Sequence, residues 1–535
     1  MAFFSVLLII IPVFTALVIY LYKHSAVKYL TFIAQLAMTI LAVLYYREFS
    51  DQWASTLIVF GDWDLRIGIS LINDEISMSF IFLTLFSFWM VLIYTFDTRQ
   101  SNRTFLFFLM FLQGVFLGLL QTYDLFNMFV FLELTTILVT ILIAFKKSGD
   151  SFRAAVYYIL LNASGVLVFL IGVIIMYNVF GTINVGVIGE AIDSVGEATS
   201  VRFAYVLMMA GIAVKSALFP VFSWLPKAHG VAQSAISALL SGLIVKGGLY
   251  MFIRINQMFS GANLESGEFF FYVGAATAVV GVLFAVSQKD IKQILAYHTV
   301  SQIGIVMMGL SSPDFDTFYG GLLHIFNHAL FKSLLFLGAG VIIKAYRTKY
   351  VSDMRGVFKT MPAVSIFMIV GMLSITGAPL FNGFISKTII KYSIEDSTLK
   401  SWILFGVNIG TATSFIKMSQ IFFGPRRMTL RLYAPFDRIA LMGFAFACVI
   451  LGNFYIPISD GFFGVELSYI SVFNFDAFFD YFVALAIGFL IYYFIIKKDY
   501  RPIRMIREYK PSFQSANFVF IMFVVVMSVY FVLIP

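Results

Sequence analysis

Sixteen apolar runs of roughly bilayer length follow one another along this chain, and they restrict it to one class of fold. A helix needs about 20 residues to cross the hydrocarbon core of a membrane, and runs of that kind recur from residue 2 to residue 534. Only 12% of the 535 residues are charged, whereas 61% are hydrophobic. So few charges cannot cover a water-soluble surface, which excludes a soluble enzyme. We expect an all-α polytopic membrane protein with about 16 transmembrane helices.

The predicted spans are 2–21, 27–46, 77–96, 104–121, 125–144, 155–178, 204–226, 231–256, 268–286, 291–311, 318–343, 363–394, 401–423, 438–457, 477–496 and 516–534. They form four predicted units: spans 1–3 in residues 1–103, spans 4–8 in 104–256, spans 9–13 in 268–423, and spans 14–16 in 438–535.

The loops between these spans alternate in charge. Most of the 36 Lys and Arg residues follow odd-numbered spans, as in the pairs Lys23/Lys28 and Arg99/Arg103 and in the loop 426–438. The opposite loops hold few basic residues and carry acidic ones such as Asp74. Because cytoplasmic loops collect Lys and Arg, we predict a multi-pass protein of the cell (cytoplasmic) membrane with both termini on the non-cytoplasmic side. The net charge of +8 is expected to face lipid headgroups, and no nucleic-acid partner is predicted.

Several ionisable residues lie inside the predicted spans, where a charge is costly. They are Glu133, Lys215, Lys246, Lys332, Lys387 and Lys417. A charged side chain at the centre of a membrane helix costs roughly 2.5–3.5 kcal/mol on insertion scales, so such residues indicate a function. A buried lysine whose carboxylate partner moves can bind or release a proton near neutral pH. The alternative is that Lys215 and Glu133 form a neutralised packing pair, and that Lys332 is bonded to carbonyls.

Two of these lysines lie beside predicted helix breaks. Pro220 follows Lys215 by five residues, and Gly377 and Pro379 interrupt the twelfth span before Lys387. Non-helical backbone at membrane depth is tolerated where it is buried in protein or lines a wet cavity, so both breaks predict water near the lysines. A kink without a transport role is the alternative.

The two breaks are five spans apart, so the seventh and twelfth spans cross the bilayer in opposite directions. The same offset relates Lys246 in span eight to Lys417 in span thirteen. We therefore predict that spans 4–8 and 9–13 are two inverted five-helix repeats with broken helices, a pattern that indicates an ion path at the midplane.

His324 and His328 lie four residues apart on one helical face, with Lys332 one turn further. This spacing can hold zinc, but no acidic residue or HExxH motif accompanies it, so a proton relay is favoured over a membrane-embedded zinc enzyme. His298 and His229 are weaker candidates. The single cysteine, Cys448, excludes disulfides and iron–sulfur ligation, and we predict neither a cofactor nor a metal.

These motifs resemble the proton-translocating, antiporter-like membrane subunits of respiratory complex I, membrane-bound hydrogenases and Mrp-type sodium/proton antiporters. The similarity rests on the segments 129–133, 215–226, 237–246, 290–297, 324–332 and 383–387, and covers about residues 55–425. The lysine at position 387 looks more like the Mrp D subunit and some complex I members, since other relatives have glutamate there. The sixteen spans depart from the usual fourteen, and the loop 497–515 is too short for a long lateral helix.

The resemblance implies two half-channels, with Glu133 paired to Lys215, Lys246 at the centre and Lys387 near the outlet. His324, His328, Lys332 and Lys417 would relay protons between them. It further implies transport of protons, with sodium as a second candidate ion, and other membrane subunits as partners in an Mrp-type, complex I-like or hydrogenase-like assembly. A structural scaffold that has lost transport is an alternative that the intact lysines disfavour.

Overall fold

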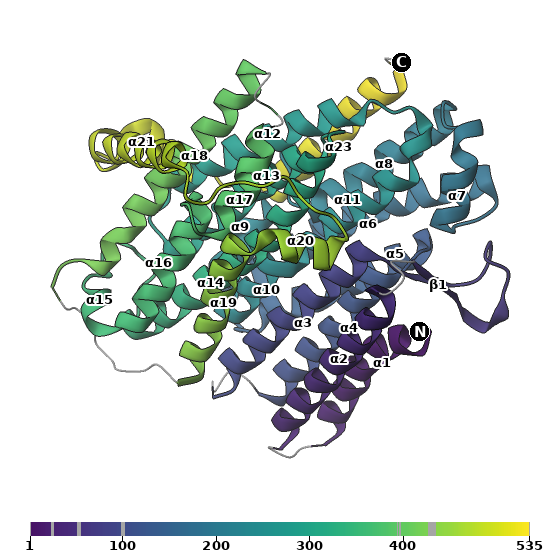
Figure 1. The fold of residues 1–535 in the computed structure, drawn as a ribbon, viewed down its shortest axis with the longest axis horizontal. Coiled ribbons are helices and arrows are strands. Elements are labelled where there is room, and N and C mark those ends of the chain that lie inside the picture. The colour runs from purple at the N-terminus through teal and green to yellow at the C-terminus, as the bar shows by residue number, and fades with distance from the viewer. Residues whose placement is uncertain are drawn as a thin grey trace.

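The computed structural model describes residues 2–22, 26–50, 55–97, 102–392, 394, 397–425 and 435–533. The predicted basic loop residues Lys23 and Arg99, and those of the segment 426–434, lie outside these residues. The described chain forms one large helical bundle, in which α1 (Ala2–Leu21), α2 (Val27–Ser50), α3 (Glu75–Thr95) and α4 (Arg103–Gln121) lie together at one end (Figure 1).

The remaining helices follow in chain order. They are α5 (Leu125–Ala144), α6 (Gly149–Phe180), α7 (Val185–Ala191), α8 (Thr199–Lys215), α9 (Trp224–Val231), α10 (Ser234–Leu239), α11 (Val245–Met258), α12 (Ser266–Ser287), α13 (Ile291–Leu310), α14 (Phe315–Tyr346), α15 (Val357–Thr360), α16 (Pro362–Thr376), α17 (Asn382–Tyr392), α18 (Thr398–Ser419), α19 (Pro435–Asn453), α20 (Tyr455–Phe463), α21 (Phe475–Ile491), α22 (Arg501–Glu508) and α23 (Phe513–Ser528). Short 3-10 turns are η1 (Phe60–Asp62), η2 (Ile192–Ser194), η4 (Ser260–Ala262) and η5 (Gln420–Phe422). Short π-helical segments are η3 (Leu240–Ile244), η6 (Tyr492–Ile496) and η7 (Val529–Leu533).

Helices occupy the positions of all the predicted spans. Within the described residues, 12 helices are long and apolar enough to cross a membrane. The predicted spans 204–226 and 363–394 are each divided into two shorter helices, α8 with α9 and α16 with α17, while 291–311 and 401–423 correspond to α13 and α18.

Side-chain caps decide where several of these helices begin. Ser148 accepts a hydrogen bond from the backbone of Ser151 and forms a capping box with it, so α6 begins at Gly149. The apolar run alone placed this start at 155, because the polar first turn carries no hydrophobic signal. Asp74 forms the same kind of box at the start of α3.

The expectation of helices alone is wrong for one small element. The strands β1 (Thr56–Val59) and β2 (Ser70–Asn73) pair antiparallel between α2 and α3. Leu71 also forms a bridge to Thr122 before α5. The hairpin is too short to show the strand alternation that a sequence reading detects.

Among the helices long and apolar enough to cross a membrane, the most buried are α14 and the series α10–η3–α11, which pack against each other. Close helix contacts depend on glycine; a Cβ atom at Gly304 of α13 would lie 2.3 Å from the backbone nitrogen of Ala278 in α12. At the C-terminus, α21 packs on α18, while α23 packs on α8 and α6.

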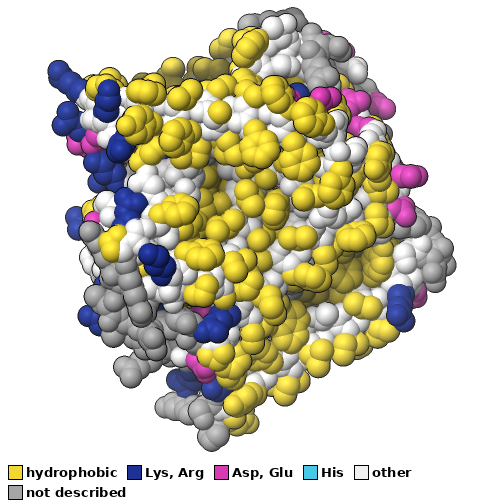
Figure 2. Space-filling view, turned by 60° about the vertical axis from the view of Figure 1, so that its left-hand side comes forward, with side chains coloured by type: hydrophobic (Ala, Val, Ile, Leu, Met, Phe, Trp, Pro, Cys, Tyr) yellow, Lys and Arg dark blue, Asp and Glu magenta, His cyan; other side chains and the backbone are white. Residues whose placement is uncertain are grey.

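The surface has the charge distribution of a membrane protein. Figure 2 shows a face on which hydrophobic side chains form a broad belt, with Lys and Arg gathered along one edge and Asp and Glu along the opposite edge. Large apolar side chains such as Phe14, Ile171 and Phe446 are more than 45% exposed. In water this belt would be unstable, whereas lipid chains can cover it.

Candidate functional site

Lys215 is the last residue of α8, where the helix stops inside the bundle. The chain turns through Ala217, which has a φ of 53°, before α9 begins at Trp224. The buried ammonium group donates to the carbonyl oxygen of Leu132 at 3.1 Å and to the Thr136 hydroxyl, both on α5. Lys215 therefore connects the broken helix to α5.

Glu133 lies on α5 next to Leu132, and among the described residues it forms no direct ion pair with Lys215. Its Oε2 atom is buried without a hydrogen-bond partner, although the carboxylate interacts electrostatically with the lysine. The direct Glu133–Lys215 pair that the family resemblance implies is therefore separated in this structure. The ammonium group has alternative acceptors on the same helix, so it can approach the carboxylate or leave it.

Lys387 lies beside the second break, on α17. Its ammonium group donates to the carbonyl oxygen of Ile375 at 2.7 Å and to Asn408 Oδ1 at 3.2 Å. The Ile375 carbonyl belongs to the last turn of α16, whose terminal carbonyls have no helical partner. A cation is favourable there because the carbonyl end of a helix carries partial negative charge.

The two breaks have the same backbone pattern. In each, an amide donates back across five residues, from Leu218 to the carbonyl of Ala213 and from Ala378 to the carbonyl of Leu373, both at 3.0 Å. The residue before each of these amides also has a positive φ, 53° at Ala217 and 78° at Gly377. Similar local geometry from two distant sequence segments is what related repeats would have.

Lys246 is fully buried at the start of α11, directly after the π-helical segment η3. Its ammonium group donates to the carbonyl oxygen of Ser241 within that segment. The Ser241 hydroxyl shares a hydrogen bond of 2.8 Å with the Thr299 hydroxyl of α13. A π-helical turn often marks a functional position, and no feature of the sequence predicted it.

The two histidines of α14 lie on one face, with ring centroids 6.4 Å apart. His324 contacts the Ser386 hydroxyl at 2.8 Å and Gln302 Oε1 at 3.2 Å, whereas both ring nitrogens of His328 are buried without a hydrogen-bond partner among the described residues. Sequence reasoning did not select Ser386 or Gln302, because isolated polar residues are common in membrane helices. Only their position beside a histidine distinguishes them.

Lys332 lies one turn beyond His328 and donates to the carbonyl oxygen of Leu295 at 2.7 Å. His328 interacts electrostatically with Lys246, Lys332, His324 and Lys387. His324, His328 and Lys332 all lie on α14, which packs against η3 next to Lys246 and against α17, the helix that carries Lys387.

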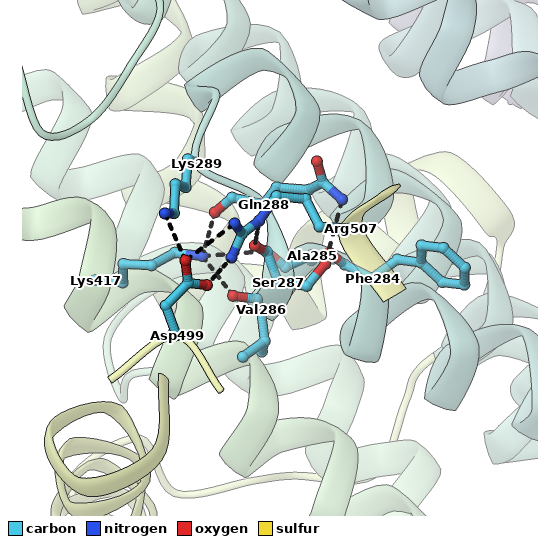
Figure 3. Close-up of polar contacts among 9 residues, drawn as sticks. All are labelled: Phe284, Ala285, Val286, Ser287, Gln288, Lys289, Lys417, Asp499 and Arg507. Carbon is cyan, nitrogen blue, oxygen red and sulfur yellow. Dashed lines mark hydrogen bonds and ion pairs between the residues drawn. The ribbon is translucent and has the colours of Figure 1, made fainter. Parts of the chain in front are cut away.

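Lys417 has different surroundings (Figure 3). Its ammonium group donates to the carbonyl oxygens of Val286 and Gln288 at 2.6 Å each and of Ala285 at 3.3 Å, at the end of α12. Arg507 of α22 donates to the carbonyl of Ser287 at 2.6 Å. These contacts are those of a helix C-terminal cap.

Asp499 joins this cluster from the segment between η6 and α22. It pairs with Lys289 at 2.7 Å and with Arg507. These partners hold the pKa of the Asp499 carboxyl well below its usual value, with the Arg507 hydrogen bond as the largest cause. The C-terminal segment is thereby attached to the end of α12.

Two polar cavities lie at opposite ends of the site. One, of about 480 Å³, is on the basic side and is lined by Ser223 and Lys227 near the first break, by Gln293, and by Arg507 and Lys510. The other, of about 530 Å³, is on the side of the termini and contains Lys387 and Asn408. Both breaks thus lie next to space that water can occupy.

A buried ion pair that the sequence did not reveal lies on the side of the termini. Arg254 of α11 is 3% exposed and binds Asp74 with contacts of 2.5 and 2.6 Å. Burial would raise the pKa of the Asp74 carboxyl, but the arginine and the hydrogen bonds from Ser77 outweigh it and hold that pKa below its usual value. The charge pattern of the loops identified Asp74 only as an acidic loop residue, and the separation of 180 residues between Asp74 and Arg254 hides the contact.

In the part of the chain that the structure describes, no group of three or more His, Cys, Asp or Glu residues is placed to hold a metal ion. The hydrogen-bond partners of His324 among the described residues are Ser386 and Gln302, neither of which is a carboxylate.

Residues 122–416 match the sequence profile of a family described as NADH:quinone oxidoreductase/Mrp antiporter, TM. Over 425 residues the chain is 28% identical to a Staphylococcus aureus protein that carries the name antiporter subunit mnhD2. That match covers 78% of this chain and 84% of the relative.

Solved structures of membrane complexes contain similar chains. One, in the membrane-bound sulfane sulfur reductase, an archaeal respiratory membrane complex, has a TM-score of 0.81 and 25% identity, covering 90% of this chain and 99% of that one. A chain of the Mrp complex from a Dietzia species has a TM-score of 0.74 and 22% identity, covering 95% and 100%. A chain of respiratory complex I from Thermus thermophilus has a TM-score of 0.74 and 20% identity, covering 91% and 99%.

Proposed function

This chain belongs to the NADH:quinone oxidoreductase/Mrp antiporter transmembrane family, and from that premise we propose that it is the D-type, proton-translocating subunit of a multisubunit Mrp cation/proton antiporter. The chain is a multi-pass membrane protein whose relatives are antiporter-like subunits of larger membrane complexes. We further propose that the chain crosses the membrane sixteen times with both termini on the non-cytoplasmic side, and that residues 104–256 and 268–423 form two inverted repeats. Residues 1–103 and 438–535 flank these repeats.

One observation carries the proposal: buried lysines and histidines lie in the region between two broken helices, and a cavity lined partly by charged and polar side chains adjoins each break. A proton from the basic side would charge Lys246 and shift Lys215 relative to Glu133. It would then pass the group containing His324 and His328 and leave through Lys387. The carbonyl acceptors of these lysines lower the cost of the charged forms without fixing them in ion pairs.

The contacts of Lys332 and Lys417 bear differently on the relay role that the sequence predicts for both. The contact of Lys332 with the Leu295 carbonyl is the one that its packing alternative predicts. Its relay role stays a prediction, which its position one turn from His328 supports. The relay role of Lys417 stays a prediction, and its three carbonyl contacts favour a capping role instead. Whether sodium passes through this chain or through a partner subunit is a separate part of the proposal, to be tested with sodium flux.

The test uses the assembled complex in membrane vesicles. Lys215→Ala, Glu133→Ala and Lys387→Ala are each expected to abolish cation-driven proton movement, measured with a pH-sensitive dye, while the subunit still inserts. Lys359→Ala, an exposed lysine on the basic side, is the matched control and should leave transport unchanged. Unchanged transport in all three variants would reject the mechanism.

A second candidate is a proton-pumping subunit of a complex I-like or hydrogenase-like respiratory machine. The TM-score of 0.81 to a chain of an archaeal respiratory complex favours it. Iron–sulfur or flavin-containing subunits that co-purify with this chain would support the second candidate, whereas their absence from an active complex would support the Mrp assembly.

A further inference from the structure

The cavity beside Lys387 is completed by a helix outside the family-matched segment 122–416. Its inner walls come from the α16–α17 break, from α17 and from α18. Its outer wall comes from α21 and the preceding loop, including Asn474, Asp476 and Asp480. The cavity is therefore formed jointly by the second predicted repeat and the C-terminal helices.

Specific contacts hold α21 in this position. The Tyr481 hydroxyl shares a hydrogen bond of 3.0 Å with the hydroxyl of Thr376, the last residue of α16. Gly488 of α21 lies close to Thr413 of α18, where an added Cβ atom would meet the backbone nitrogen at 3.0 Å. The helix thus reaches the break itself.

Lys391 is the next ionisable residue after Lys387 on α17. Residues four apart on a helix lie on the same face with Cβ atoms about 6 Å apart, so the two lysines repel each other when both are charged. Asp480 of α21 pairs with Lys391, with Nζ and Oδ2 3.4 Å apart. Both side chains of this pair line the cavity and are partly exposed, 49% for Lys391 and 64% for Asp480.

We propose that α21 completes the outlet of the proton path, and that Asp480 is a positioning residue that balances the charge of Lys391 so that Lys387 can hold its proton before release. The inference rests on the proposed proton path through Lys387. The other titratable groups that line the cavity are Asp476 and Tyr481 of α21 and the tyrosines 392 and 469, whereas α18 contributes uncharged residues such as Asn408. On the inner side, His324, His328 and Lys332 of α14, which packs on α17, also interact electrostatically with Lys387, and the variants below leave them unchanged. Asp480 is thus the carboxylate paired with the lysine nearest to Lys387 along α17.

The experiment measures the pH dependence of cation-driven proton transport by the assembled complex in vesicles. Asp480→Asn leaves Lys391 unbalanced, which opposes protonation of the neighbouring lysine, so the pH of half-maximal transport should fall by roughly 0.5–1 unit. Lys391→Gln leaves Asp480 unbalanced and should raise that pH by a similar amount. The double variant should return it close to the starting value, because charge balance is restored.

Two controls keep the result interpretable. Glu466→Gln, an exposed carboxylate on the same side that does not line the cavity, should leave the pH profile unchanged. Asp480→Glu should retain the original profile, because it keeps the charge. A loss of transport in Lys387→Ala together with an unshifted profile in Asp480→Asn and Lys391→Gln would overturn this inference alone. Normal transport in Lys387→Ala would instead overturn the proposed function.

Discussion

Replacing Lys417 by Met tests whether this lysine caps α12 or relays protons. The ammonium group contacts three carbonyl oxygens at 2.6–3.3 Å at the end of the helix. Hydrogen bonds from a charged donor contribute about 1.5–3 kcal/mol each in favourable cases, and a cation at a helix C-terminus adds about 0.3–1 kcal/mol. The side chain is only partly buried, so water replaces some of these contacts, and Arg507 and Lys289 repel the charge.

We therefore expect Lys417→Met to lower the free energy of unfolding by about 2–3 kcal/mol. With an unfolding entropy near 2.1 cal/mol/K per residue, a chain of this length loses roughly 2–3 °C of melting temperature. The measurement is thermal unfolding of the purified complex, followed by transport per assembled complex in vesicles. Transport should remain above half of the starting rate, because a cap does not carry the proton.

The matched control is Lys400→Met, a lysine at the opposite end of the same helix. The Lys400 ammonium nitrogen lies 4.5 Å from the centroid of the buried Phe271 ring, and such a half-buried contact contributes about 0.5–2 kcal/mol. A variant Lys417→Met with unchanged melting temperature and abolished transport would refute the capping interpretation and restore the relay role.

Two further changes test charges on the side of the termini. Asp74→Asn keeps the helix cap but leaves Arg254 buried without a countercharge, so it should cost about 3–5 kcal/mol in thermal unfolding, and the double change Asp74→Asn/Arg254→Met should cost less. Asp124 caps α5, and burial raises its pKa to about 6. The protonated Asp124 carboxyl stabilises the fold fully below its unfolded pKa near 3.8, and this contribution is lost as the pH rises through 6. Asp124→Asn, which cannot ionise, should therefore raise the free energy of unfolding at pH 7.5 by at most about 3 kcal/mol and change it little near pH 4. Equal effects of Asp124→Asn at both pH values would contradict this assignment.

The open arrangement of Glu133 and Lys215 gives the proposed path a physical basis. A closed buried ion pair resists separation, because each partner left alone in a low-dielectric environment costs several kcal/mol, on the order of 3–5. Lys215 instead contacts the Leu132 carbonyl and Thr136, which can accept a hydrogen bond from the charged form at less cost. A small movement along α5 would then change the interaction with Glu133.

The C-terminal helices connect parts of the molecule that the two predicted repeats leave separate. Helix α21 packs on α18. The chain then passes the end of α12, which Asp499 and Arg507 contact, and continues into α23, which packs on α8. Lys227 of α9 also donates to the carbonyl oxygen of Pro511 at 2.6 Å. The last helices therefore contact both polar cavities, which gives residues 475–533 a structural role in the site.

The sequence by itself determined the membrane class, the approximate positions of the helices, both breaks and the burial of Lys215, Lys246, Lys332 and Lys387. These features follow from properties that act locally along the chain: hydrophobicity over about 20 residues, the missing amide of Pro220, and the cost of a charge such as Lys246 in lipid. The alternating charge of the loops can be read from the sequence in the same way, because it depends on the Lys and Arg residues within each loop.

Only the tertiary structure decided what each buried charge contacts. Lys417 and Lys387 are both lysines within predicted spans, yet one caps α12, 129 residues away at Gln288, and the other lies in a polar cavity. The pairing of Arg254 with Asp74 and the part that α21 plays at the outlet were equally hidden. The reason is that the free energy of a buried charge depends on the acceptors and water that packing brings to it, and those come from distant parts of the chain.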